Sequence, residues 1–590
     1  MKWRIVGFWL VVFVGIWLFL DSFGTFSFHR QEEVQLFIPE WGVIREMLSV
    51  PGGFCMVVGQ AFVQYYASSL FVLWVNSFFL CSIGFICYLI LQEIVPHEYH
   101  LLLALFPVFG LLKAHINPFY VLDGTVGILL FLLFLYGGIR IKNDKWRMVY
   151  GVISVVFLYG LSGQLAALYG LAVVFLEWVS FRKNKLVSLV VCLLGGLLAY
   201  IGCRISHILP LTDGIYSLRF QEAQMQPDSL IYYVWIRFTC LLFVIWGMAF
   251  VLKNLLETKR LVKIFVVGGL LVFLFLFSSY CLPGIYEVEN VRLDEWDVHA
   301  QMSDWDEIID HHRERKSKGN IGLTYLNWAL AQKGMLADSL FHYDQQGVQS
   351  LLAPWNKTYY MSCLLSDIHY ALGDISLSEG YAMEGLTLAK RGGSPRMLQR
   401  LVKINLIRRN LALADKYISL LGRLPNYRHW SEKYVGYIHH PKRIEEDEEL
   451  GAKRIPAFQS DNLLCLVDID SLWFGHLLGS GANRIVWEYL GCYYLLSKDM
   501  EKFKTFLKRS DFFLREKSIP VHFQEAALVL AVDDQTVLDY IDVRSAIVER
   551  YKLFQKDIQK ISNSSDGLSW LYRYYGDTFW YYFFCKKLKV

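Results

Sequence analysis

Charged residues are scarce in this sequence: aspartate, glutamate, lysine and arginine together make up 19% of its 590 residues. Because charged residues make up about a quarter of a typical soluble protein, this deficit excludes a wholly soluble globular chain. The deficit is uneven, since the long apolar runs lie almost entirely before residue 283 and the remainder resembles a soluble helical protein in composition. We therefore predict two parts: a transmembrane domain at 1–282, with a first outer loop at 21–67, and a helical domain at 283–590.

Motifs for metals and nucleotides are also missing. The eleven cysteines include no CxxC pair and no cysteine–histidine cluster with zinc spacing, so we predict no structural metal. The chain contains neither a P-loop nor a GxGxxG motif. The net charge of +4 is small for this length and argues against nucleic acid as a partner. Membrane lipid is the first partner that the composition predicts.

The apolar runs predict nine membrane spans. The run at 148–181 is too long for one crossing and carries Ser162-Gly163-Gln164 at its middle, so we divide it into two short spans. The other seven spans are expected at 5–20, 68–91, 101–113, 119–139, 186–205, 229–252 and 264–282.

Basic residues predict the orientation of these spans. Nine spans place the basic N-terminus and three basic loops, at 140–147, 182–185 and 253–263, on the same side of the membrane. The positive-inside rule makes that side cytoplasmic. The loop at 21–51, the loop at 206–228 and everything after residue 282 are then expected outside.

Helical repeats are predicted after residue 283. Turns at 333–335, 372–374 and 409–411 each separate two amphipathic segments, at spacings close to the tetratricopeptide period of about 34 residues. Trp487, Leu490, Gly491 and Tyr494 fit the W-x2-L-G-x2-Y signature of that repeat. The predicted fold class is therefore all-α: a polytopic transmembrane helical domain of about nine spans, followed by a soluble tetratricopeptide-like solenoid.

The strongest candidate for chemistry follows the first span. Glu32 and Glu33 are adjacent in a stretch that has few other polar residues, and Asp21 is a third acidic candidate. Residues 54–65 then form an amphipathic segment that is expected to lie on the membrane surface. A carboxylate pair brought into a cavity there would be a catalytic candidate. The alternative is a solvated loop in which both glutamates face water.

Two resemblances bear on function. The residues Pro51-Gly52-Gly53 and Gln64-Tyr65-Tyr66, with Ile-Pro-Val-His-Phe-Gln-Glu-Ala at 519–526, resemble an uncharacterised bacterial family of multi-pass membrane proteins, a domain of unknown function. The layout is similar to that of type-C glycosyltransferases that carry extracytoplasmic tetratricopeptide repeats. That likeness rests on architecture and is an analogy. Together the resemblances imply a bacterial cytoplasmic (inner) membrane protein with its C-terminal domain outside.

The second resemblance implies transfer of a sugar from a polyprenyl-phosphate-linked donor to an extracytoplasmic acceptor. A peptide or protein acceptor, modified on Ser or Thr, would be held by the repeat domain. The catalytic carboxylate would be Glu32, Glu33 or Asp21. Because no Asp-Asp or Asp-x-Asp stands beside them, a divalent cation is left open as a cofactor. The donor phosphate would be held by basic residues, for which the candidates are Arg204, His207, Arg219 and Arg30.

Two other functions compete with transfer. One is a non-catalytic membrane-anchored scaffold for envelope assembly, in which individual carboxylates are dispensable. The other is a transporter, which the few ionisable residues within the spans, Asp123, Glu177 and Arg237, disfavour.

Overall fold

The protein is helical, and no strand occurs in the part of the chain that the computed structural model describes. The described residues are 2–94, 96, 99–117, 120–163, 165–181, 185–205, 241–242, 244–249, 268–274, 276–277, 288–314, 319–389, 391–454, 483–510, 519–560 and 565–587. They fall into two compact units. The first contains Met1–Val291 and two later segments, Ala389–Arg396 and Ser419–Lys433, and the second contains the rest.

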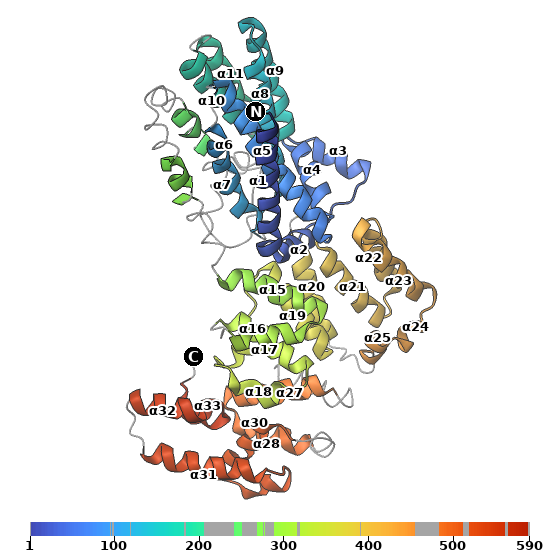
Figure 1. Ribbon diagram of the computed structural model, residues 1–590. Helices are drawn as coiled ribbons and strands as arrows, with labels where there is room; N and C mark the ends of the chain where they lie inside the picture. The colour runs from blue at the N-terminus through green and yellow to red at the C-terminus, as the bar shows by residue number, and fades with distance from the viewer. Residues whose placement is uncertain are drawn as a thin grey trace. The chain divides into compact units, whose positions relative to one another are not determined.

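The first unit is a bundle of apolar helices (Figure 1). Its elements are α1 (Lys2–Phe23), α2 (Thr25–Glu33), α3 (Trp41–Leu48), α4 (Gly53–Val63), α5 (Ser69–Ile94), α6 (His100–Leu103), α7 (Leu105–His115), α8 (Leu122–Arg140), α9 (Asp144–Ser162), α10 (Leu165–Phe175), the π-helix η1 (Leu176–Phe181) and α11 (Lys185–Ile205).

Three of these helices are long and apolar enough to cross a membrane: Trp3–Phe23, Leu70–Ile94 and Leu122–Arg140. They correspond to the spans predicted at 5–20, 68–91 and 119–139. Large apolar side chains such as Leu10 on α1 and Phe78 on α5 are exposed, which is the arrangement that a lipid environment would favour.

The remaining predicted spans are not confirmed. Helix α9 ends at Ser162, and Gly163 has a positive φ of 62°, so the chain breaks where the two short spans were divided. Helices α7 and α10 have only 11 residues each. The spans expected at 229–252 and 264–282 lie mostly outside the described residues. The count of nine therefore stays a prediction.

The predicted outer loop at 21–67 is mainly helical. Helix α1 continues to Phe23, so Asp21 lies inside a helix, and α2, α3 and α4 follow. On α4 the buried face contains Cys55, Gly59 and Gln60. On the expected amphipathic face, Phe54 and Tyr65 are partly exposed, whereas Val58 and Phe62 pack against the apolar core of the unit. The position of this segment on the membrane surface therefore stays a prediction.

The second unit consists of short helices, several paired as hairpins. Most of its residues lie in the following elements: α15 (Val288–Met302), α16 (Trp305–Glu314), α17 (Asn320–Gln332), α18 (Leu336–Ser339), η3 (Leu340–His342), η4 (Val348–Ser350), α19 (Tyr359–Leu372), α20 (Ile375–Leu388), α21 (Pro395–Ile407), α22 (Leu411–Leu421), η5 (Pro425–Tyr427), α23 (Arg428–His439), α24 (Arg443–Glu446), α25 (Glu448–Ala452), α27 (Arg484–Ser497), α28 (Met500–Arg509), α30 (Val521–Leu530), η6 (Gln535–Asp539), α31 (Ser545–Lys560), α32 (Ser565–Tyr575) and α33 (Phe579–Cys585). Of these elements, η5 lies wholly within the first unit. Four others lie partly within it: α15, α21, α22 and α23.

The turns of three hairpins lie where the sequence predicts them, and a fourth turn, at Lys498, has the same geometry. Gly334, Gly373, Arg409 and Lys498 each have a φ between 58° and 85°. In each turn the following N–H bonds to the carbonyl five residues earlier, as Asp374 does to His369 at 2.8 Å. This is the Schellman termination, in which a left-handed residue stops a helix and satisfies its last carbonyls.

A linear tetratricopeptide solenoid is nevertheless not shown. The second helix of the first hairpin, α18, has only four residues. Helix α27 packs against α17, α18 and α19, more than a hundred residues earlier in the chain (Figure 1). Glu488 on α27 accepts hydrogen bonds from the backbone N–H groups of Leu336 and Ala337. Since a solenoid stacks consecutive repeats, this order of neighbours leaves the solenoid a prediction.

Candidate functional site

Helix α2 turns its polar residues inward. Glu32 and Glu33 are only 3% and 2% exposed, and Arg30 and Gln31 are also buried. The alternative in which both glutamates lie in a solvated loop is therefore wrong. Burying two adjacent carboxyl groups is costly unless hydrogen bonds or cations compensate for the lost water, so their partners decide what the site can do.

The partners of the two glutamates come largely from residues beyond the predicted transmembrane domain. Arg396 Nη1 lies 3.3 Å from Glu33 Oε2, and His29 Nε2, on α2 itself, lies 3.4 Å from Oε1. The Tyr427 hydroxyl donates to Glu32 Oε2 at 2.8 Å. Arg396 and Tyr427 belong to the two later segments of the first unit. Glu33 therefore has the Arg396 guanidinium beside it, whereas Glu32 accepts a hydrogen bond from a phenol.

A second ion pair joins the segment at 389–396 to α8. The Arg391 guanidinium contacts the Asp123 carboxylate twice, at 2.8 Å and 3.3 Å. Arg391 also accepts a backbone hydrogen bond from Leu36 at 2.8 Å. Gly392 follows with a φ of 81°, and a Cβ there would lie 3.0 Å from the Leu36 carbonyl oxygen. Glycine is therefore needed at this crossing.

Amide side chains make the purely structural hydrogen bonds around the glutamates. Gln31 Nε2 donates to the carbonyls of His115 and Asn117, at 3.1 Å and 2.8 Å. Gln35 Nε2 donates to the carbonyl of Gln60 at 3.2 Å. These bonds connect α2 and the residues after it to α7 and α4. Neutral amide side chains therefore connect these helices on either side of the carboxyl pair.

Burial raises the pKa of Glu32 to about 8, from an ordinary value of 4.5. Loss of water is the largest cause, the Tyr427 hydrogen bond lowers the pKa, the charge of Glu33 raises it, and Asn426 lowers it slightly. Burial and the two glutamates also raise the pKa of Tyr427 well above 10, so its hydroxyl stays protonated. A carboxyl group with a pKa near 8 can take up and release a proton at close to neutral pH.

The other predicted site residues do not join this cluster. Asp21 is exposed in the last turns of α1. Arg204 lies on α11, but its side chain is outside the described part of the chain, and His207 and Arg219 are outside it altogether. Arg30 is the one predicted phosphate-binding residue that the structure brings beside the glutamates, since it is buried on α2.

Sequence reasoning missed Arg391, Arg396 and Tyr427. A local signal exists for the arginines, because they flank Gly392-Gly393-Ser394-Pro395, a break in an otherwise helical region. Such a break marks a loop that approaches another element closely. The sequence carries no sign that the approached element is α2, several hundred residues earlier.

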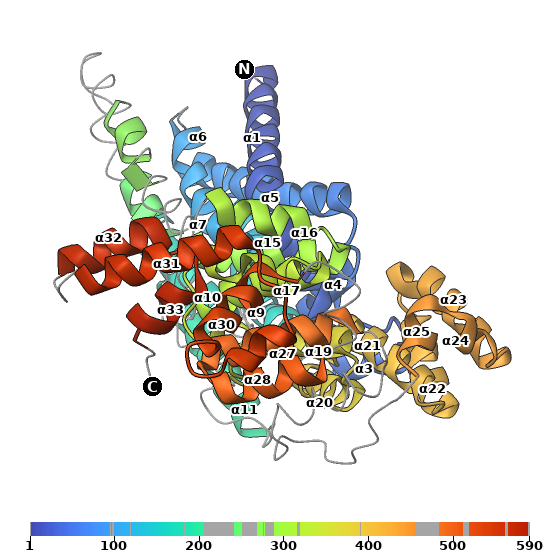
Figure 2. The ribbon, with the colours of Figure 1, turned by 90° about the horizontal axis from the view of Figure 1, so that it is seen from below.

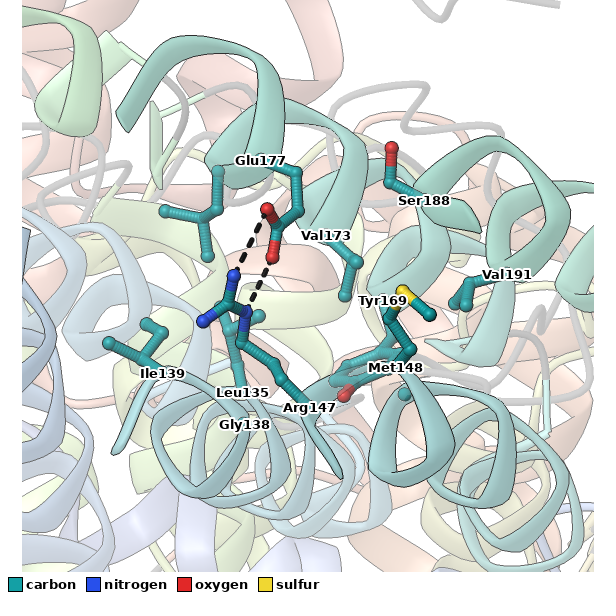
Figure 3. A pocket seen from close by; sticks show the side chains of 12 residues that line it. Leu135, Gly138, Ile139, Arg147, Met148, Tyr169, Val173, Glu177, Ser188 and Val191 are labelled. Atoms are coloured by element: carbon teal, nitrogen blue, oxygen red, sulfur yellow. Dashed lines mark hydrogen bonds and ion pairs between the residues drawn. The ribbon is translucent and has the colours of Figure 1, made fainter. Parts of the chain in front are cut away.

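A second polar cluster lies inside the first unit beside a small cavity (Figure 3). Arg147 on α9 holds Glu177 on η1 through two contacts, at 2.6 Å and 3.4 Å, and also donates to Asp144 and to the Ile141 carbonyl. The cavity of about 40 Å³ has room for about one water molecule. This pair is compensated on every side, and its cavity is too small for a substrate.

No cluster of three or more histidine, cysteine, aspartate or glutamate residues that could hold a metal ion is present where the structure is described. Glu32 and Glu33 offer two carboxyl groups, with the Arg396 guanidinium and the His29 imidazole beside Glu33. Chemically, the arrangement is suited to proton transfer at Glu32.

The chain was compared with protein-family models, with curated proteins and with solved structures. No curated protein and no solved structure matched the chain. A family model did match, over residues 1–586, and it therefore covers both structural units. The chain belongs to the family of unknown function DUF6057.

Proposed function

We propose that this protein is an integral membrane glycosyltransferase of type-C layout, in which Glu32 is the general base. It transfers a sugar from a polyprenyl-phosphate-linked donor to a hydroxyl of an extracytoplasmic acceptor. The observation that carries the proposal is the burial of the Glu32 carboxyl beside Glu33, with a phenol as a hydrogen-bond donor, which raises its pKa to about 8. Nine spans, a cytoplasmic N-terminus and an extracytoplasmic second unit are part of the same proposal.

The choice of residue at position 32 supports a functional role. A glutamine there would keep size and hydrogen bonding, and Gln31 and Gln35 already make structural hydrogen bonds on either side. A carboxyl beside Glu33 costs stability that an amide would not cost. Strongly perturbed carboxyl groups are typical of catalytic sites, where a cost in stability is accepted for reactivity.

The proposed reaction is a single displacement. The Glu32 carboxylate takes the proton of the acceptor hydroxyl as the oxygen forms a bond to the anomeric carbon. The bond from that carbon to the phosphate oxygen breaks, and polyprenyl phosphate leaves with the electron pair. A base is most effective when its pKa lies near the working pH, and the pKa of Glu32 is raised to about 8.

Glu33 and Arg396 have a positioning role in this proposal. Their ion pair fixes the end of α2 and therefore the direction of Glu32. The negative charge that develops on the leaving phosphate needs a cation, and Arg30 on α2 is the described candidate among those predicted. Arg204, His207 and Arg219 stay predictions for the same role, as does a peptide or protein acceptor held by the second unit.

The test compares glycans on extracytoplasmic proteins and lipids in cells that carry wild type, Glu32→Gln or the deletion. Loss of a general base commonly costs about 100- to 10,000-fold in rate, so Glu32→Gln should match the deletion. Glu46→Gln is the matched control, because Glu46 is an exposed glutamate on α3. Protein levels must be equal. If Glu32→Gln leaves glycans unchanged while the deletion alters them, Glu32 is not the base.

A non-catalytic scaffold is the second candidate, and one observation favours it. Asp123 and Glu33 each form an ion pair with an arginine from the segment at 389–396, so these pairs anchor that segment within the first unit. If a deletion changes no glycan, and Arg396→Ala and Arg391→Ala disturb only folding and assembly, the scaffold replaces the transferase.

A further inference from the structure

The second unit contains a cavity of about 330 Å³ between residues 341–345 and the helices α32 and α33. Pockets that hold small molecules usually measure about 300–1,000 Å³, so this one is large enough for a ligand. Five tyrosines and five charged side chains are among its lining residues. In Figure 2, α31, α32 and α33 lie together at the C-terminal end of the chain, and α30 contacts α31 and α33.

Four of the five charged groups of the cavity occur as partly exposed pairs, and the fifth is Arg573. Arg550 and Asp577 form a two-pronged contact, with nitrogen–oxygen distances of 2.7 Å and 3.3 Å, and their side chains are 41% and 42% exposed. Lys586 pairs with Asp344 on the opposite segment. Each pair presents a donor directly beside an acceptor. Carboxylate oxygens have more lone pairs than these contacts use, so both pairs can bind a further group.

Aromatic rings supply the other part of the wall. The rings of Tyr572 and Tyr581 have centroids 5.5 Å apart, at an interplanar angle of 60°. Tyr572 and Tyr574 are about half exposed. A phenol ring offers an apolar face and a polar edge, which suits a ligand that has both C–H and O–H groups.

The walls are held by a buried pair on α30. Glu525 Oε2 accepts from His522 Nδ1 at 2.8 Å and from the backbone N–H of Phe579, the first residue of α33, at 2.8 Å. His522 Nε2 accepts from the backbone N–H of Phe341 at 3.4 Å. One histidine–glutamate pair therefore fixes both sides of the cavity. A pre-organised pocket of this kind loses little entropy when it binds a ligand.

We propose that this cavity is a binding site for a neutral saccharide. A sugar hydroxyl donates to a carboxylate and accepts from a guanidinium or ammonium group at one atom, which matches the adjacent members of each ion pair. The C–H faces of the sugar ring pack on the exposed tyrosines. The ligand class follows from this lining and does not depend on the proposed transfer reaction.

The same lining disfavours other ligands. The lining has three basic residues, but a phosphate or a polyanion at either ion pair would lie beside the carboxylate of Asp344 or Asp577, which would repel it. An apolar ligand would remove water from both ion pairs, at a cost in free energy. A peptide presents its amide donor and its carbonyl acceptor at separate places, so a single backbone group does not satisfy both members of a pair.

The test uses the full-length chain in detergent and calorimetric titration with maltohexaose, cellohexaose, chitohexaose, xylohexaose and mannohexaose at millimolar concentration. At least one hexaose should bind. Asp577→Asn and Tyr572→Ala should each weaken that binding about tenfold or more, since each removes a direct contact. Tyr540→Ala is the control, because Tyr540 is similarly exposed in the same unit and does not line the cavity. It should bind like wild type.

Three results would overturn the proposal. The first is that none of the five hexaoses binds. The second is that a hexaose binds but neither cavity variant weakens it relative to Tyr540→Ala, which would place the site elsewhere. The third is that inorganic phosphate or a tryptic peptide pool binds in their place and Tyr572→Ala abolishes that binding. A thermal unfolding measurement on each variant distinguishes misfolding from the loss of a ligand contact.

Discussion

Glu32 and Glu525 are both buried helical glutamates, but they have opposite surroundings. Glu525, in the second unit, accepts from the His522 ring and from a backbone N–H. Glu32, in the first unit, accepts a hydrogen bond from a phenol and lies beside a second carboxyl, and its pKa is raised to about 8. A compensated carboxyl stabilises a fold, whereas an uncompensated one costs stability and gains proton affinity. The comparison therefore separates a structural glutamate from a candidate for chemistry.

The largest effect on stability is expected from Glu525→Ala. Removing the carboxyl leaves two buried donors, His522 Nδ1–H and the Phe579 N–H, without their acceptor, at a cost of roughly 1–3 kcal/mol for each. Amide hydrogen exchange of the full chain should show faster exchange in α30 and α33. Glu549→Ala, at an exposed position on α31, is the control and should change little. Equal protection of the amides from exchange in both variants would show that Glu525 does not stabilise α30 and α33.

Overpacking at Gly491 is expected to have the next largest effect. A Cβ at this position would lie 2.2 Å from the Phe523 ring and 3.0 Å from Phe506, so the site is filled. Gly491→Leu should destabilise the second unit by roughly 1–3 kcal/mol. Gly436→Leu is the matched control, since the nearest atom there is the end of the Arg443 side chain at 3.9 Å. A thermal melt in which both variants behave alike would contradict tight packing at this hairpin.

The pH dependence of stability sharpens the comparison at Glu32. Because its folded pKa, about 8, lies above the ordinary value of 4.5, the folded state holds the proton more tightly than the unfolded state does. The contribution of Glu32 is therefore fully present below pH 4.5 and is lost as the pH rises through about 8. Melting temperatures measured from pH 5 to pH 9 should fall more in wild type than in Glu32→Gln. Parallel curves for wild type and Glu32→Gln would mean that burial does not raise the pKa of Glu32.

Tyr427→Phe should give the smallest effect. The hydroxyl donates to Glu32 and lowers its pKa, so its removal should raise that pKa further. The pH at which the Glu32 contribution is lost should then move upward, with a change in stability of about 1 kcal/mol. Tyr65→Phe is the control, since Tyr65 is an exposed tyrosine that follows the end of α4. A downward shift in Tyr427→Phe would show that the phenol does not stabilise the charged form.

Local features of this protein could be predicted from the sequence because they depend on neighbouring residues. Apolar length is sufficient for the three long helices, and Ser162-Gly163-Gln164 is sufficient for the break between α9 and α10. The turns at Gly334 and Gly373 follow from glycine's access to positive φ. The W-x2-L-G-x2-Y pattern predicts a filled helix contact at Gly491, and the contact with Phe506 and Phe523 is present.

The candidate site was predicted only in part. Glu32 and Glu33 were selected from their position after the first span, but a sequence pattern cannot distinguish a solvated pair from a buried one. Burial depends on residues that come back to α2 from distant positions, Arg396 and Tyr427 among them. The same limit applies to the repeats, because a helix pattern predicts hairpins but does not specify which hairpins become neighbours.

The sequence by itself determined the all-helical character of the described chain, its apolar segments and the ends of many helices. Those properties arise from hydrophobicity and backbone preference over a few residues. Tertiary structure alone decided that Glu32 lies in a dry environment and that Glu525 lies beside its donors. The reason is that the charge state of a carboxyl depends on the water, cations and hydrogen-bond donors within a few ångströms, and folding supplies these from anywhere in the chain.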